Sequence, residues 1–263
     1  MNVPLYNTNG EKVSEVELPP IFGVPVKFEL IKRAVIAEQT QRLQPKSPYR
    51  FAGMETSAKY RGRKDSYGSL KNRGQAMLPR EVLPKGRWGK VRRIPSSVKG
   101  RRAHPPKVEK IIHEKINKKE RRAALISALA ATANPSLVLK RGHKINDSTP
   151  LPIVVDDNFE ALSKTKDVLK FLSKLIPQDI LRSKGGKKRK TGVRKRSSKV
   201  VRYPKSALIV ASENSKVLLA ARNLPGIDVC TPKTLSVELL APGTYPGRLT
   251  IFTQNSLSEL SKL

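Results

Sequence analysis

Two adjacent carboxylates are the best sign of catalytic chemistry in this sequence. Asp156 and Asp157 directly follow the apolar run from Leu151 to Val155, and many α/β enzymes place acid–base groups at the carboxyl end of such a strand. The sequence DDNFEALSK equally fits Asp157 or Asn158 as the cap of the next helix. Capping is the better interpretation, and an RNA-modifying or RNA-cleaving α/β enzyme remains the alternative hypothesis.

Other side chains that could serve in catalysis or metal binding are scattered along the chain. They are three histidines and one cysteine: His104, His113, His143 and Cys230. These residues lack the spacing of metal ligands, and one cysteine cannot form an intramolecular disulfide. Ser212 and Ser215 lack a GxSxG elbow, and no glycine-rich phosphate motif follows a predicted strand. We therefore expect no enzymatic activity, metal, cofactor or small-molecule substrate.

The positive charge of the chain is concentrated in two segments. Lysine and arginine number 53 against 21 acidic residues, giving a net charge of +32. Residues 44–108, called the basic segment, hold 18 basic and three acidic residues, and residues 182–205, called the second basic tract, hold 12 basic and no acidic residues. Together they carry +27, which leaves only +5 for the other 174 residues. Because like charges repel, two segments this rich in cations are expected to bind a polyanionic partner.

Nucleic acid is the expected polyanion rather than an anionic membrane. No apolar run approaches the roughly 20 residues that span a bilayer, and the amino-terminal sequence MNVPLYNTNGEKV lacks the basic-then-apolar pattern of a signal peptide. We therefore expect no membrane association.

The basic segment is predicted to be a long loop, because glycine and proline recur too often for a helix or a regular strand. Tyr49, Phe51, Tyr60, Tyr67 and Trp88 alternate with cations, a pattern typical of stacking on unpaired RNA bases beside phosphate contacts. A disordered tail is the alternative, although such tails usually lack aromatic residues. The predicted RNA-binding residues of this loop are Arg50, Tyr60, Arg61, Arg63, Lys64, Lys71, Arg73, Arg80, Arg101, Arg102 and His104.

The second basic tract lies between two apolar segments and therefore resembles an insertion in a connection. RNA contact, a nuclear-import signal and a disordered arm all fit its low-complexity composition. The residues predicted to contact RNA are Lys187, Lys188, Arg189, Lys190, Arg194, Lys195 and Arg196.

Two predicted helices bracket the basic segment and could pack together as its base. Apolar residues recur at helical spacing from Val26 to Leu43 and again from Val108 to Ala133. Asn134 and Pro135 are expected to end the second helix. The apolar faces of these helices are formed by Phe28, Ile31, Ala34, Val35 and Ala37 in the first and by Ile112, Ile116, Ala123, Ile126 and Ala130 in the second.

The remaining chain alternates strand-like and helix-like stretches. The expected strands are 151–155, 207–211, 227–230 and 249–253, and the expected helices are 159–175, 215–221, 235–240 and a terminal helix. This alternation predicts a Rossmann-like three-layer α/β fold with helices on both faces of a mostly parallel sheet, from which a long extended basic loop protrudes. Residues 1–43 and 109–263 would form the globular domain, residues 44–108 the RNA-penetrating loop, and residues 182–205 an insertion.

Several motifs resemble one known family. KINKKERRAALISALAATANP from Lys115, LPKGRWGKVRRIP from Leu83, GRRAHPP from Gly100, LAARNLPGIDV from Leu219 and ELLAPGTYPGRLTIFT from Glu238 are similar to segments of the universal large-subunit ribosomal protein family L-four. The last motif resembles the archaeal form of that family. The similarity extends over most of the chain from about Tyr49 onward.

The resemblance implies a structural component of the cytoplasmic large ribosomal subunit, with large-subunit ribosomal RNA and neighbouring ribosomal proteins as partners. It also implies a loop that reaches the peptide exit tunnel and meets the nascent polypeptide. By motif, the tip residues would be Lys85, Gly86, Arg87, Trp88, Gly89, Lys90, Arg92 and Arg93. The site residues at the loop-base helix would be Lys115, Asn117, Lys118, Lys119, Arg121 and Arg122.

Overall fold

The computed structural model describes residues 2–145, 149–192 and 200–261, and the chain divides into two compact units. The first unit comprises Met1–Arg42 and His113–Leu263, and the second comprises Leu43–Ile112. Within the described residues, no helix is both long and apolar enough to cross a bilayer.

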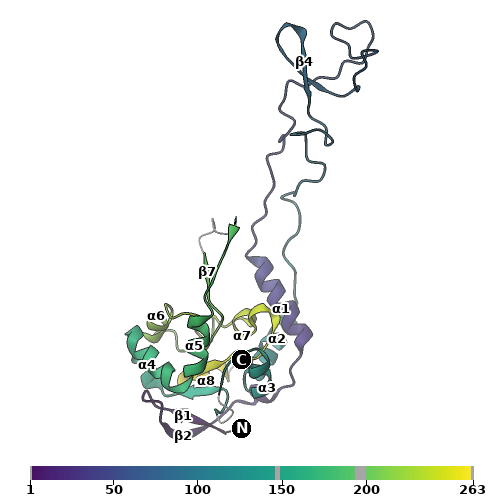
Figure 1. The fold of residues 1–263 in the computed structure, drawn as a ribbon. Helices are drawn as coiled ribbons and strands as arrows, with labels where there is room; N and C mark the ends of the chain where they lie inside the picture. The colour runs from purple at the N-terminus through teal and green to yellow at the C-terminus, as the bar shows by residue number, and fades with distance from the viewer. Residues whose placement is uncertain (1, 146–148, 193–199, 262–263) are drawn as a thin grey trace. The chain divides into compact units, whose positions relative to one another are not determined.

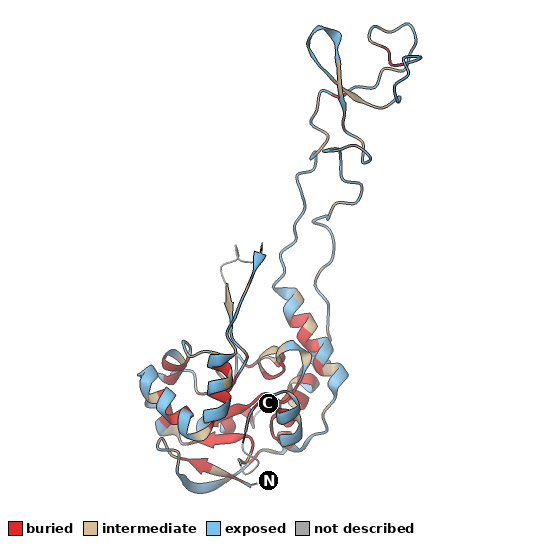
Figure 2. Cartoon of the chain, in the orientation of Figure 1, coloured by how far each residue is buried: buried red, intermediate tan, exposed pale blue. Residues whose placement is uncertain are grey.

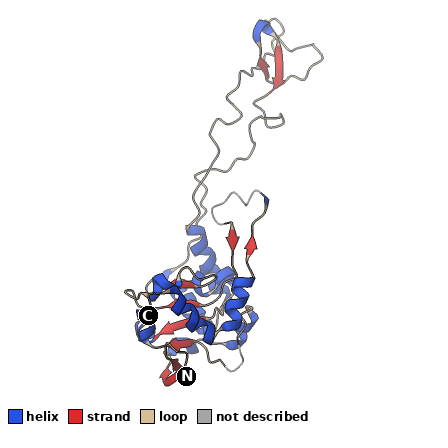
Figure 3. Ribbon diagram, turned by 60° about the vertical axis from the view of Figure 1, so that its left-hand side comes forward, coloured by secondary structure: helices blue, strands red, loops and turns tan. Residues whose placement is uncertain are grey.

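A six-stranded sheet with the order β2-β1-β5-β10-β8-β9 forms the centre of the first unit (Figure 1, Figure 3). Its strands are β1 Asn2–Tyr6, β2 Lys12–Glu17, β5 Ile153–Val155, β8 Leu208–Val210, β9 Asp228–Cys230 and β10 Thr250–Thr253. Strand β2 is antiparallel to β1, and every other neighbouring pair is parallel. The predicted α/β fold with a mostly parallel sheet is therefore confirmed, including the four expected strands.

Helices connect the strands of the first unit. The α-helices are α1 Phe28–Gln41, α2 Lys118–Thr132, α3 Pro135–Lys140, α4 Thr165–Leu175, α5 Pro177–Gly185, α6 Val217–Ala221, α7 Val237–Leu240 and α8 Gln254–Leu260. The 3-10 helices are η1 Pro20–Gly23, η3 Asp157–Ala161 and η5 Pro242–Thr244.

Side chains that alternate along the buried strands form two apolar clusters, because successive residues of a strand point to opposite faces. Val154 and Phe252 pack with residues of α1, α2, α7 and α8. Ile153 and Ile251 pack with residues of α3, α4, α5 and α6. The inner strands are buried on both faces, as the red strands of Figure 2 show, which explains why they are continuous apolar runs in the sequence.

The helix expected from Val108 begins only at Lys118. Ile112 and Ile116 are four residues apart, a spacing that suits a helix but equally places both residues on one side of an extended chain. The backbone N–H of Glu114 donates to the hydroxyl of Thr40 in α1, 3.1 Å away, instead of to a helical carbonyl. The buried face of α2 also differs from the expected one, since Ala123 is exposed. That face contains Ala124, Ser127, Ala128 and Ala131.

Other elements depart from the prediction as well. The helix expected over 159–175 is divided into η3 and α4 by residues 162–164. Strands β1 and β2 and helices α3 and α5 were not expected, and both of these helices have proline at the first position. Proline ends a preceding helix but also fits the first turn of the next one, so Pro135 does both.

Candidate nucleic-acid interface

The second unit contains a short β-hairpin, which corrects the expectation of a loop without regular strands. Strand β3 Arg80–Val82 pairs antiparallel with β4 Trp88–Val91, and the 3-10 helix η2 Pro84–Gly86 connects them. The backbone N–H of Leu83 closes the turn by donating to the carbonyl of Arg87 over 2.9 Å. Strands this short fit between the glycines and prolines that exclude longer elements.

The hairpin contains six of the eight residues predicted as the loop tip, and the other two, Arg92 and Arg93, directly follow β4. Lys85 and Gly86 have positive φ angles of 58° and 71°, a conformation that costs glycine little and lysine more. A side chain at position 86 would also meet the hydroxyl of Tyr67, only 2.6 Å from an added Cβ. Lys85, Gly86, Arg87, Lys90 and Arg93 are exposed.

A contact between Arg61 and Trp88 connects the segment around Arg61 and Tyr67 to the hairpin. The Arg61 guanidinium lies over the Trp88 ring at 5.8 Å and donates to the carbonyl of Tyr67 at 2.8 Å. The indole Nε1 of Trp88 and the Nε of Arg80 are buried without a hydrogen-bond partner among the described residues. The Trp88 ring is thus half-buried and packs against other residues of this unit instead of being fully exposed.

Arg92 forms the ion pair of this unit. Its Nε lies 2.7 Å from the carboxylate of Glu81, and its Nη1 donates to the carbonyl of Val98 over 2.6 Å. The hydrogen bond from Arg92 lowers the pKa of Glu81. Arg92 therefore fixes the hairpin to the segment that follows it.

Most other predicted RNA-binding residues of the basic segment are exposed and carry no ion pair. Among the described residues, the Arg92–Glu81 contact is the one ion pair that involves any of the 18 basic residues in 44–108. The half-buried members of the predicted set are Arg61, Arg80, Trp88, Gly89 and Arg92. The exposed members are Arg50, Tyr60, Arg63, Lys64, Lys71, Arg73, Arg101, Arg102 and His104.

The second basic tract forms a hairpin of its own within the first unit. Strand β6 Lys188–Arg189 pairs antiparallel with β7 Val201–Arg202, and the Lys187 ammonium lies 6.0 Å from the centre of the Tyr203 ring. Lys187 is exposed, as are both residues of β6, and Lys190 is half-buried. The predicted residues Arg194, Lys195 and Arg196 lie outside the described residues.

A buried carboxylate fixes both ends of this tract. Asp179, fully buried, accepts from Arg182 Nε at 2.8 Å and from the Ser206 hydroxyl at 2.6 Å. The His143 ring also lies beside it, with Nδ1 3.2 Å away. Burial alone would raise the pKa of Asp179, but the hydrogen bonds from His143 and Arg182 hold that pKa far below its usual range.

The protonation of His143 follows from its partners. The backbone N–H of Leu249 donates to Nε2 at 3.3 Å, so Nδ1 carries the proton that faces Asp179. If Nε2 were also protonated, it would be a donor facing the Leu249 N–H donor, and this hydrogen bond would be lost. Burial lowers the pKa of His143, which agrees with a neutral ring that serves in structure.

Arg248 and Asp228 form a second buried pair near this network. The Arg248 side chain is fully buried, and its Nη2 lies 2.7 Å from the Asp228 carboxylate. Arg248 also donates to the carbonyls of Ser206 and Leu239, at 3.0 and 2.9 Å. Apart from Asp179 and Arg182, which are three residues apart, the side-chain partners in both networks are at least 20 residues apart, so no local pattern in the sequence indicates them.

The predicted residues at the loop-base helix are exposed. Lys118, Lys119, Arg121 and Arg122 belong to the first turns of α2, whereas Lys115 and Asn117 precede the helix.

Helices α1 and α2 pack against each other, as the sequence indicated. Ile31, Ala34 and Val35 of α1 share an apolar cluster with Ala124 and Ala128 of α2. Two ion pairs connect the helices: Arg33 to Glu120 at 3.3 Å, and Arg121 to the buried Glu38 at 3.6 Å.

The two aspartates that could indicate an enzyme act as caps. Asp156, rather than Asp157 or Asn158, is the cap of η3 and accepts from the backbone N–H of Asp157 at 2.8 Å. Asp157 accepts from the backbone N–H of Asn255 in α8 at 2.9 Å, and burial raises its pKa. The polar groups at this edge of the sheet therefore join elements to one another.

A third carboxylate at the same edge, Glu160, was missed in the sequence. It accepts from the backbone N–H of Ser212 at 2.9 Å and from the Thr253 hydroxyl at 2.6 Å. Glu160 thus connects the ends of β8 and β10, and Ser212 serves as a turn residue. The hydroxyl of Ser215 donates to the carbonyl of Ser212 over 2.9 Å, as expected for a local turn.

The remaining candidates for chemistry are placed as follows. Cys230 is buried at the end of β9, and burial raises its pKa to about 12, so its thiol is not poised for reaction. His113 is exposed but precedes α2 rather than lying on it. In the described part of the chain, no cluster of three or more histidine, cysteine, aspartate or glutamate residues could hold a metal ion.

Comparisons with known proteins agree with the motifs and the fold. The model of the ribosomal protein L4/L1 family matches residues 16–263. The large ribosomal subunit protein uL4 of Methanocaldococcus jannaschii is 46% identical over 263 residues, which are 100% of this chain and 99% of that protein. The proteins of the same name from Methanococcus maripaludis strain C6 and Haloquadratum walsbyi are 44% and 43% identical over 262 residues, 99% of each chain. This chain therefore belongs to the ribosomal protein L4/L1 family.

Proposed function

We propose that this chain is a structural constituent of the cytoplasmic large ribosomal subunit, where it binds and stabilises large-subunit ribosomal RNA beside neighbouring ribosomal proteins. One observation carries the proposal. The basic segment holds 18 cations, and among the described residues one of them has a carboxylate partner in the chain. Exposed cations without partners repel one another until phosphates neutralise them.

The two basic extensions would have different positions in the RNA. In this proposal residues 1–43 and 109–263 would form the α/β body, a Rossmann-like layered domain, and residues 44–108 would be the loop that penetrates between RNA helices. The second basic tract, residues 182–205, supplies another RNA contact. Its base is held by Asp179, whose bonds to Arg182 and Ser206 fix both ends of the tract.

The β3–β4 hairpin is the part of the loop that would reach the peptide exit tunnel and meet the nascent polypeptide. Its turn presents Lys85 and Arg87 as exposed cations, and the pair Arg92–Glu81 stiffens it. The proposal rests on the family to which the chain belongs and on this exposed, internally braced turn.

An RNA-modifying or RNA-cleaving enzyme is not supported. The family to which the chain belongs is one of ribosomal proteins. Asp156 and Asp157 also accept hydrogen bonds from the backbone of η3 and α8, which accounts for these carboxylates without a substrate.

Sedimentation through sucrose at high salt tests the proposal. Nonspecific phosphate binding weakens steeply as salt rises, so a structural constituent should stay with the large subunit when loosely bound basic proteins are released. A chain found mainly in the slow fractions at moderate salt would contradict the proposed function and would favour a free nucleic-acid chaperone or regulator.

A further inference from the structure

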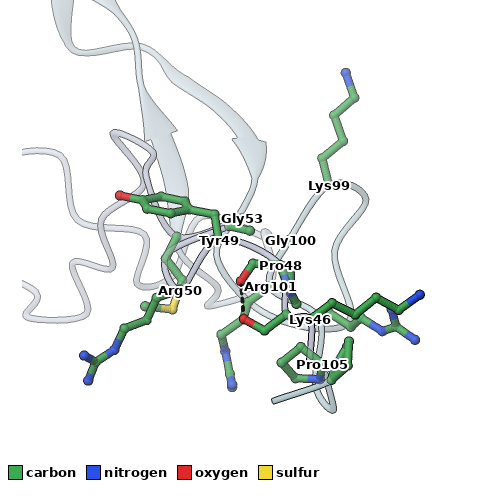
Figure 4. Close-up of a pocket in the computed structure, with 14 residues that line it drawn as sticks. Lys46, Pro48, Tyr49, Arg50, Gly53, Lys99, Gly100, Arg101 and Pro105 are labelled. Carbon is green, nitrogen blue, oxygen red and sulfur yellow. Dashed lines mark hydrogen bonds between the residues drawn. The ribbon is translucent and has the colours of Figure 1, made fainter. Parts of the chain in front are cut away.

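A hollow of about 600 Å³ lies wholly within the second unit (Figure 4). Its walls come from residues 46–54 and 99–106, the two arms of the basic segment. A volume of this size suits a ligand comparable to one nucleotide.

The hollow is built by tight turns and by a close approach of backbones. Ala52 and Met54 donate to the carbonyls of Tyr49 and Phe51 over 3.0 and 2.8 Å, which curls the outgoing arm. Gly53 has a φ of 78°, and a Cβ added there would stand 2.5 Å from the carbonyl oxygen of Gly100. The two arms can meet at this distance only because position 53 has no side chain.

The walls of the hollow combine cationic side chains with the flat rings of proline and tyrosine. The cations are Lys46, Arg50, Lys99, Arg101 and Arg102. All five are exposed, and no acidic residue is among the described residues that line the hollow. Prolines supply apolar wall, and Tyr49 adds an aromatic ring.

The Tyr49 ring is held by two contacts within the second unit. Its hydroxyl donates to the Glu55 carboxylate over 2.6 Å, and that hydrogen bond raises the pKa of Tyr49. The ring also makes an edge-to-face contact with Phe51, with centroids 5.8 Å apart. A fixed, 60% exposed ring can stack on a base with little loss of side-chain entropy.

We propose that this hollow binds a single unstacked RNA nucleotide, with its base against Tyr49 and its flanking phosphates among the five cations. The inference rests on the proposed function and narrows it, because a fully paired A-form helix offers phosphates but no free base face. A site that bound phosphates alone would need the cations but not the hollow or the Tyr49 ring.

Two RNA hairpins with the same stem and loop test the proposal. One is fully paired, and the other carries a single additional bulged 2-aminopurine. The full-length chain should bind the bulged hairpin more tightly and should quench its fluorescence as the base stacks. Tyr49→Ala should weaken binding of the bulged hairpin about five- to 150-fold, the effect of losing one base–aromatic stack, and should leave the paired hairpin unchanged.

Matched variants separate the ring from general effects on the unit. Tyr49→Phe keeps the ring and should keep the preference for the bulged hairpin. Ile111→Ala truncates another exposed large side chain of the same unit, one that does not line the hollow, and should behave as the unaltered chain. Equal binding of both hairpins by the unaltered chain would overturn the nucleotide site while leaving RNA binding intact. Failure to bind either hairpin would overturn the proposed function as well.

Discussion

Ionisable side chains in this protein divide by burial into two groups with different roles. His143, Asp179 and Arg248 are buried and have their hydrogen-bonding groups matched to partners inside the first unit. Arg63 and Lys64 are exposed cations of the second unit without an ion pair among the described residues. Buried charges are tolerated only with partners, so the first group stabilises the fold and the second remains available for RNA.

His143 should make stability depend on pH. Its pKa is lowered in the fold, whereas an unfolded histidine titrates near about 6.5. Below that pH the unfolded chain binds a proton that the folded chain refuses. The free energy of unfolding should therefore fall as pH decreases from about 7 to about 5, by up to about 1.4 kcal/mol per pH unit. Asp179, with its lowered pKa, should lose its contribution only below about pH 4.

Urea unfolding at a series of pH values measures this dependence. His143→Gln should be less stable than the unaltered chain and should lose most of the slope between about pH 7 and 5. His113→Gln alters an exposed histidine and should retain the slope. Identical slopes for the unaltered chain and His143→Gln would contradict the assignment.

Asp156→Ala should reduce stability without reducing RNA affinity. The substitution removes the acceptor for the backbone N–H of Asp157, and loss of such a cap costs about 1 kcal/mol. Thermal unfolding and RNA binding of the same preparation check both parts. A normal melting temperature combined with lost activity on RNA would instead support the enzyme hypothesis.

At the scale of elements, burial decided what could be predicted. Strands β5, β8 and β10 are buried on both faces, so they are short apolar runs that a sequence displays plainly. Strand β2 is mostly exposed and reads as KVSEVE, which carries little apolar signal. Its identity as a strand depends on pairing with β1, a contact that the sequence does not reveal.

The double role of proline explains why helix α3 was missed. Pro135 correctly predicts the end of α2, but it is also the first residue of α3. Asn134 caps α3, with its side chain accepting from the backbone N–H of Ser136 at 3.1 Å. The sequence Asn134-Pro135 therefore ends one helix and begins the next. The packing of Val138 in the core favours the formation of the second helix, and the sequence alone does not reveal that contact.

The meeting of the two arms at Gly53 gives a prediction at this scale. Gly53→Ala would place a Cβ 2.5 Å from the Gly100 carbonyl oxygen, whereas Gly74→Ala would meet no atom within 4 Å. Both glycines have positive φ, 78° and 67°, so both variants bear similar backbone strain. Only Gly53→Ala must also separate the arms.

Filter binding to large-subunit ribosomal RNA compares the two variants. Gly53→Ala should bind about tenfold more weakly than Gly74→Ala, the size of a modest overpacking penalty. Equal affinities would show that the close approach of the arms has no part in RNA binding.

At the scale of the whole molecule, the location of charge was the most informative property of the sequence. Counting residues places +27 of +32 in two segments, and in the structure one of these is a separate compact unit and the other a hairpin. The count of charges could not predict the β3–β4 hairpin, whose strands are only three and four residues long. It could not predict the close approach of the arms at Gly53 either, because Gly53 and Gly100 are far apart along the chain.

The same charge predicts that the second unit is protected only in the assembled state. In the free chain, repulsion among its cations should leave residues 47–104 open to protease while the first unit resists. In purified large subunits the segment should be resistant. Mass spectrometry of the digests identifies the cleavage sites, and similar cleavage of the segment in both states would argue against coupling between its folding and RNA binding.

The central claim is that RNA surrounds the basic segment in the large subunit, and ultraviolet cross-linking of purified, salt-washed subunits tests it most directly. Cross-linked peptides should map to residues 44–108, with sites near Tyr49 and the β3–β4 hairpin, and should carry fragments of large-subunit ribosomal RNA. Cross-links confined to the first unit, with residues 44–108 recovered unmodified, would contradict the claim.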